Sequence, residues 1–240
     1  MNNGVRRALQ VLAAASMVMA PAIGIANGND DDDDPPIREL TAQWWQWALS
    51  IPTGVNPLKD LSGANCMVGQ RGSIWFLAGP TLFDFTAVTR HCSVPEGVTL
   101  FFPIVNSVQV NTPNACGQTG PYSVAFMRVN NAGFIDKVTK TTLTLDSIAL
   151  RGTRRVTSVP FVSALPADNI FVEPCNDPQL PLPHGQPPGV FSPSVDDGYY
   201  AKIEGLKAGK HLLHFTAAIP DFNINVNVTY DLDVVPVSSR

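Results

Sequence analysis

The sequence predicts a mainly β fold, an antiparallel two-sheet sandwich of the jelly-roll or immunoglobulin-like kind with one tryptophan-rich helix at its N-terminal end. Residues 222–234 alternate apolar and polar side chains without a break, as an antiparallel strand does when one face is buried and the other is solvated. Several shorter apolar runs lie between turn-forming residues, and the 21 prolines fall mainly between these runs. A single core built from two sheets follows from this pattern.

The N-terminus has the order of a secretory signal peptide. Two arginines precede an apolar run over residues 11–20, and small-residue patterns follow within residues 20–26. The run is shorter than the roughly 20 residues that a membrane-spanning helix needs. We expect residues 1–26 to be removed after Ala26, with Ala22 as the alternative. The mature protein is then exported to the periplasm or the extracellular space and has no membrane span.

Residues 27–36 are expected to form an acidic linker, because five consecutive aspartates at residues 30–34 repel one another and stay solvated. They lack the spacing and the glycine of a calcium loop. Without residues 1–26, 14 of the 16 basic side chains remain against 20 acidic ones, for a net charge of −6. That balance leaves no concentrated basic face for a nucleic acid partner. Residues 37–240 are predicted to be a single β-sandwich domain.

One helix is predicted directly after the linker. Prolines 35–36 mark its start and Pro52 its end, and an apolar stripe at helical spacing comprises Leu40, Trp44, Trp47 and Ile51. The stripe predicts that Trp44 and Trp47 cover the core and that Trp45 faces a second surface. A sugar-stacking platform is the alternative for the cluster. Trp45 is therefore a candidate ligand-binding residue.

Further strands are predicted from short β-prone runs. They lie at residues 73–78, 98–105, 122–129, 142–150, 199–203 and 211–217. Glycines separate the last of these, so residues 199–234 are expected to form a meander. The C-terminal strand is longer than an ordinary strand, and we expect a bend or bulge along it.

The four cysteines are even in number in a chain sent to an oxidising compartment, so disulfides are expected. Three pairings are open. We favour Cys66–Cys92, which bracket one strand-like run, and Cys116–Cys175, which bracket the middle of the domain. No C-x-x-C or C-x-x-H pair is present to start a metal site, so neither a metal nor a cofactor is expected.

Catalytic motifs are missing from the sequence, which has no G-x-S-x-G, no H-E-x-x-H and no glycine-rich phosphate loop. The four histidines are interpreted as structural or surface residues. Asp196 and Asp197 precede a glycine and are interpreted as a turn. No catalytic residue is predicted, and a non-catalytic protein is favoured. The alternative is a secreted hydrolase whose carboxylates, Glu173 among them, or whose histidines meet only in the folded chain.

The polar face of the C-terminal strand supplies the remaining candidate ligand-binding residues, Asn223, Asn225 and Asn227. Amides two residues apart form a ladder of donors and acceptors on one sheet surface, although a solvated outer face is polar in any case. With Trp45, they suggest a secreted, non-catalytic protein that binds a glycan or another cell-surface component. A structural envelope protein is a further alternative.

Several motifs lie along nearly the whole mature chain. They are Trp44-Trp45-x-Trp47, Asn56-Pro57, Cys66-x-x-Gly69-Gln70-x-Gly72-x-x-Trp75-Phe76-Leu77-Ala78-Gly79, Cys92-x-Val94-Pro95-x-Gly97 and Asp197-Gly198-Tyr199 through Gly209-Lys210-His211. Together they resemble a family of secreted bacterial proteins of unknown function. The resemblance implies a bond between Cys66 and Cys92, and it implies no activity or binding residue.

Overall fold

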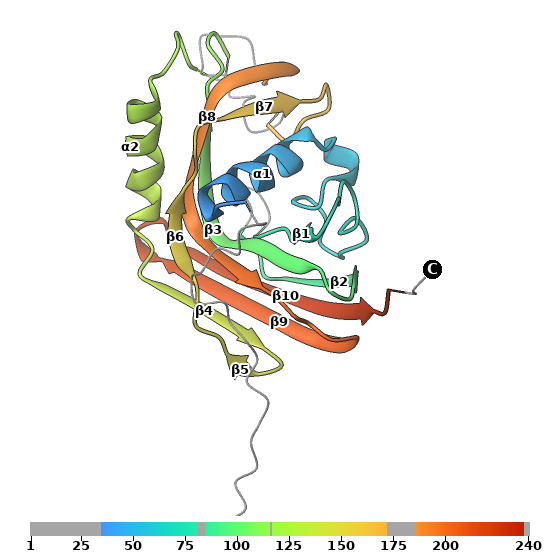
Figure 1. Ribbon diagram of the computed structural model, residues 1–240. Coiled ribbons are helices and arrows are strands. Elements are labelled where there is room, and N and C mark those ends of the chain that lie inside the picture. Colours follow the sequence, from blue (N-terminus) through green and yellow to red (C-terminus); the bar gives the residue numbers. More distant parts are fainter. Residues whose placement is uncertain (1–34, 81–84, 116, 172–185, 238–240) are drawn as a thin grey trace, which may run out of the picture.

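The computed structural model describes residues 35–80, 85–115, 117–171 and 186–237. Within these ranges the chain forms two five-stranded sheets packed together, with two α-helices beside them (Figure 1). The predicted mainly β, two-sheet fold with an N-terminal tryptophan-rich helix is confirmed. The expected signal peptide, residues 1–26, and residues 27–34 of the expected linker lie outside the described ranges.

The elements follow one another in a fixed order along the chain. They are α1 (Ile37–Ser50), a 3₁₀ turn η1 (Thr53–Val55), β1 (Ile74–Phe76), β2 (Val88–Pro95), β3 (Thr99–Val110), α2 (Val124–Ile135), β4 (Lys140–Leu145), β5 (Ile148–Ala149), β6 (Arg154–Thr157), β7 (Phe161–Leu165), β8 (Gly189–Ile203), β9 (Gly209–Ile219), η2 (Pro220–Phe222) and β10 (Ile224–Val235). The helix α1 ends two residues before Pro52, as predicted.

Both sheets are mixed rather than purely antiparallel. The first has the order β1-β3-β8-β6. Its fifth strand, β7, also pairs with β8, over residues 189–194, whereas β6 pairs with residues 197–200 of the same strand. The second sheet has the order β2-β10-β9-β4-β5. The pairs β1–β3 and β2–β10 are parallel. The prediction of an antiparallel sandwich missed both pairs, because apolar alternation reports which face of a strand is buried and not the direction of its neighbour.

The strand β10 confirms the clearest pattern in the sequence. Its residues alternate between buried and more exposed from Ile224 to Val235. It begins two residues later than predicted, because Phe222 lies in the η2 turn and Asn223 adopts a left-handed conformation with φ of 54°. The pairing of β10 with β9 shows no register shift. The register shifts lie instead in the first sheet, between β3 and β8 at Pro103 to Val105 and between β7 and β8 at Phe161 to Ser163.

The segment predicted as a strand at residues 122–129 lies largely in α2, so that prediction is wrong. Ser123 caps the helix by accepting a hydrogen bond from the backbone N–H of Phe126 at 3.2 Å. The helix buries Met127, Asn131 and Ile135 at four-residue spacing. The β-prone residue types of this segment misled the prediction, whereas the cap and the four-residue spacing match the helix that forms.

The meander predicted for residues 199–234 is also wrong. The strand β8 belongs to the first sheet, whereas β9 and β10 form a hairpin in the second. The chain therefore crosses from one sheet to the other between Ile203 and Gly209. Two of its glycines, Gly205 and Gly209, have positive φ of 70° and 140° in this crossing.

Two apolar cores hold the layers together. One lies between the two sheets, and the other lies between α1 and the first sheet and contains the three tryptophans of the helix. Figure 1 shows α1 lying across the first sheet, with α2 beside the upper part of β8. The first sheet thus carries a different neighbour on each face, which places its polar residues in two separate environments.

The predicted disulfide between Cys66 and Cys92 is confirmed, with an S–S distance of 2.08 Å. Cys116 and Cys175 lie outside the described residues, so their pairing stays a prediction. None of the helices in the described ranges is long and apolar enough to cross a membrane.

Candidate functional site

Asp196, Asp197 and Gly198 lie in the middle of β8 and not in a turn, so the turn predicted for them is wrong. Pairing with β3 on one edge and β6 on the other leaves the two aspartates only 1% and 3% exposed. The glycine serves a close approach of strands, because a Cβ at Gly198 would lie 2.5 Å from the Cβ of Asn106. Strand alternation sends the side chain of Asp196 to the α1 face and that of Asp197 to the opposite face.

On the α1 face, Asp196 is the centre of a buried hydrogen-bond network. Its Oδ1 accepts from the indole N–H of Trp45 at 2.7 Å and from the hydroxyl of Tyr200 at 2.8 Å. The amide Nδ2 of Asn106 donates in turn to the Tyr200 oxygen at 2.9 Å. These bonds join α1, β3 and β8 in one chain of neutral donors and acceptors.

Burial raises the pKa of Asp196 well above its usual range, and the neighbouring charge of Asp197 adds to the rise. The hydrogen bonds from Trp45 and Tyr200, with a contribution from the Thr41 hydroxyl, favour the charged form but do not offset the burial. Burial therefore favours the protonated form of this carboxyl. Because Oδ1 already accepts two hydrogen bonds, the proton belongs on Oδ2, which has no partner in hydrogen-bonding geometry.

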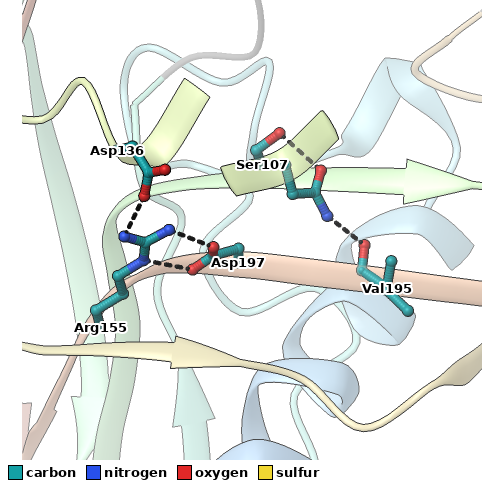
Figure 2. A network of polar contacts seen from close by, with 6 residues as sticks. Ser107, Asp136, Arg155, Val195 and Asp197 are labelled. Atoms are coloured by element: carbon teal, nitrogen blue, oxygen red, sulfur yellow. Dashed lines mark hydrogen bonds and ion pairs between the residues drawn. The ribbon is translucent and has the colours of Figure 1, made fainter. Parts of the chain in front are cut away.

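On the opposite face, Asp197 is held by a guanidinium clamp (Figure 2). Arg155 donates through Nε to Oδ1 at 3.0 Å and through Nη2 to Oδ2 at 2.7 Å, and its Nη1 donates to Asp136 at 2.6 Å. The hydrogen bonds with Asp197 are the largest cause of a raised pKa for Arg155. The clamp ties β6, β8 and the end of α2 together, which indicates a structural role.

A second polar contact attaches α2 to the first sheet. The buried Asn131 accepts from the Ser107 hydroxyl at 3.0 Å and donates to the backbone carbonyl of Val195 at 3.0 Å. Figure 2 shows this pair of bonds running from β3 through α2 to β8. Since the Ser107 proton is used in this bond, the hydroxyl is not prepared to act as a nucleophile.

A cleft of about 370 Å³ lies next to these two networks. Its lining is drawn from both helices, from the strand β3 and from three loops. The described lining residues are Trp44, Trp45, Leu58, Gly79, Pro80, Phe85, Asn106, Ser107, Val108, Gln109, Asn130, Phe134 and Phe171. We call this space the β3 cleft. A second cavity of about 300 Å³ shares Val108, Gln109, Asn130 and Phe171 with it and extends it along the strand.

The β3 cleft is lined by aromatic, aliphatic and neutral amide groups. None of its described lining residues is an aspartate, glutamate, lysine, arginine or histidine. Its volume falls within the usual size of ligand pockets, which are mostly apolar with a few polar groups that fix orientation. An uncharged ligand suits this lining, because a charged one would lose hydration without gaining a partner.

The candidate residues from the sequence are not gathered in one place. Trp45 is 2% exposed and hydrogen-bonded to Asp196, so the prediction that it faces a second surface is wrong, although it does contribute to the lining of the β3 cleft. Asn225 and Asn227 lie at the start of β10 in the other sheet, and Asn223 lies just before that strand, after η2. Asn225 and Asn227 border a separate shallow depression.

The sequence interpretation missed Asn106 and Asn130, although an Asn-Ser pair at 106–107 directly after a long apolar run offered a clue.

The histidines and carboxylates form isolated pairs instead of a site. Nδ1 of His91 lies 3.1 Å from Oδ2 of Asp231, and Nδ1 of His211 lies 2.8 Å from Oδ2 of Asp146. His214 shares a hydrogen bond of 2.9 Å with the amide oxygen of Asn227. The described residues contain no group of three or more side chains that could hold a metal ion. Glu173 and His184 lie outside the described ranges.

Comparison with known proteins assigns no further role to these residues. No protein-family model matches the chain, and no curated protein or solved structure matches it either.

Proposed function

We propose that the protein is an exported, non-catalytic binding protein whose β3 cleft takes an uncharged ligand, either a glycan or an uncharged part of another cell-surface component. The observation that carries the proposal is the composition of the cleft, which combines aromatic and aliphatic walls with neutral amides. Glycans and peptides both offer hydroxyl or amide groups beside apolar surface, and both match such walls.

The raised pKa of Asp196 supports the same class of ligand. Its carboxyl lies behind the cleft wall and is joined to two lining residues, to Trp45 directly and to Asn106 through Tyr200. Burial favours the protonated form of this carboxyl, which disfavours a buried negative charge on this side of the cleft. A cationic ligand would therefore find no counter-ion there.

Export is supported by two independent features. The N-terminal 26 residues have the order of a signal peptide. The Cys66–Cys92 disulfide suits an oxidising compartment, where such bonds persist.

Binding of the mature protein, residues 27–240, to immobilised polysaccharides and to envelope fractions tests the proposal. Gln109→Arg places a long cation in the cleft, and Asn225→Arg places the same cation on the outer face of β10 as a matched control. Retention that falls about tenfold or more in Gln109→Arg alone supports the cleft. A loss in Asn225→Arg alone moves the ligand to the amide ladder of β10, and folded protein that nothing retains rules out the proposed function.

A further inference from the structure

The strand β3 has one edge that no described strand covers over much of its length. It pairs with β8 along residues 100–110, but with β1 only at residues 99–101. The chain after β1 still lies against β3 at Gly79, where an added Cβ would meet the side chain of Pro103 at 3.0 Å. Residues 104–110 therefore have no described strand on the β1 side.

The β3 cleft lies beside this edge. It is lined by four consecutive residues, Asn106 to Gln109. Successive side chains of a strand point to opposite faces, so a cavity that touches all four lies alongside the strand and not on one of its faces. The second cavity continues along the same edge to Val110.

The two helices flank the edge from opposite faces of the sheet. On one side the walls are Trp44 and Trp45 of α1, with Leu58. On the other side they include Asn130 and Phe134 of α2, which the bond between Ser107 and Asn131 holds against β3. A strand placed here would have walls for both sets of its alternating side chains.

We propose that the β3 cleft binds an extended peptide segment of another envelope protein, which adds to the first sheet as a strand along residues 106–110. Ile104 and Val105 are completely buried, so the accessible part of the edge begins at Asn106. This inference rests on the proposed function and names its ligand class. An exposed strand edge presents backbone N–H and C=O groups at a regular spacing that another strand can pair with, whereas a glycan has no backbone with that spacing. Five residues at about 3.3 Å each give room for a short strand of about 17 Å.

The lining sets the sequence that such a peptide needs. Its central side chains are uncharged, because the described walls hold no charged group. Side chains directed to the α1 side are apolar, because that side is lined by Leu58 and by the small exposed parts of the α1 tryptophans. Those directed to the α2 side meet the amides of Gln109 and Asn130, which make no hydrogen bond with the described part of the chain.

A phage-displayed library of random 12-residue peptides, selected on the oxidised mature protein, supplies the probe. Selected peptides are synthesised again with single backbone N-methyl groups at each position in turn. We expect methylation at every second central residue to weaken binding about tenfold and methylation between those residues to have little effect, because alternate N–H groups of an added strand face its neighbour. Gln109→Arg weakens binding similarly, and Asn225→Arg leaves it unchanged.

Each other outcome counts against the inference in a distinguishable way. If peptides bind in the cleft but N-methylation weakens binding no more at alternate residues than at the residues between them, strand addition is ruled out. If no selected peptide depends on Gln109 while a polysaccharide is retained through it, the ligand is a glycan, and the proposed function survives without the inference. If folded protein retains neither class of ligand, both fail.

Discussion

Trp45 in α1 donates its indole N–H to Oδ1 of Asp196 in β8 at 2.7 Å, joining residues 151 positions apart in the sequence. Both side chains are almost completely buried, and burial raises the pKa of the accepting carboxyl. The bond therefore holds the tryptophan helix on the first sheet through a buried carboxyl whose protonated form is favoured. Removing this hydrogen bond tests how α1 is held on the first sheet.

Replacing Asp196 by asparagine should leave the protein close to wild-type stability near pH 4, where the folded carboxyl is protonated. The amide retains the oxygen that accepts from Trp45 and Tyr200 and places a neutral NH₂ at the position of Oδ2. We expect a change within about 1 kcal/mol in the free energy of unfolding, against a loss of about 2–4 kcal/mol for Asp196→Ala, which leaves two buried donors without an acceptor. Urea denaturation followed by tryptophan fluorescence measures both. Equal losses in the two variants would mean that the carboxyl is charged.

The same pair of proteins shows the pH dependence of Asp196. Its pKa in the folded protein is raised above the unfolded value near 3.8, so its contribution to stability is fully present below that pH and is lost as the pH rises toward the folded pKa. Asparagine does not titrate. The free energy of unfolding of Asp196→Asn should therefore gain on wild type as the pH rises above about 4, and a constant difference would contradict the raised pKa.

Removing the clamp on Asp197 should cost much more than removing its outer partner. Arg155→Ala leaves a carboxylate that is 4% exposed without its cation, for a loss of about 3 kcal/mol in the free energy of unfolding. Asp136, 58% exposed, is the matched control, and Asp136→Ala should cost less than about 1 kcal/mol. Adding Asp197→Asn to Arg155→Ala should recover part of the loss in chemical denaturation, because no buried charge then remains. No recovery would place the effect in packing.

The Cys66–Cys92 bond should stabilise the fold mainly by restricting the unfolded chain. Its loop spans 26 residues, for which loop closure predicts about 3 kcal/mol. The double variant Cys66→Ala with Cys92→Ala should lose that amount in chemical denaturation while its far-ultraviolet circular dichroism stays native.

Non-reducing peptide mapping of the same samples tests the predicted Cys116–Cys175 bond, and a free thiol at either position would contradict it.

The contact between His211 and Asp146 should stabilise the hairpin of β4 and β5 against β9 mainly at acidic to neutral pH. Burial alone would lower the pKa of His211, but the hydrogen bond with Asp146 raises it above its ordinary value. The stabilisation is then present below about pH 6.5 and is lost as the pH rises through the folded pKa. Asp146→Asn should bring the His211 pKa, measured by NMR titration, down toward its ordinary value, with a stability cost below about 1 kcal/mol. An unchanged titration would show that the contact does not form in solution.

The sequence predicted the features that depend on local pattern. Prolines bounded the helix α1, and alternation identified β10 within two residues of its start. It could not indicate that β2 lies parallel beside β10, because the partners come from distant parts of the chain and no hairpin turn links them. Direction and order of strands are properties of the assembled sheet.

The candidate site was mostly beyond what local pattern reports. The Asp-Asp-Gly segment has the composition of a turn, yet Asp196 pairs with Trp45 and Asp197 with Arg155, so that both carboxyls accept hydrogen bonds inside a central strand. The sequence by itself determined which segments bury apolar faces and where the chain breaks, since those depend on neighbours in the chain. Only the tertiary structure decided the raised pKa of Asp196 and the edge of β3 that no described strand covers, since burial, pairing and protonation depend on residues that meet only after folding.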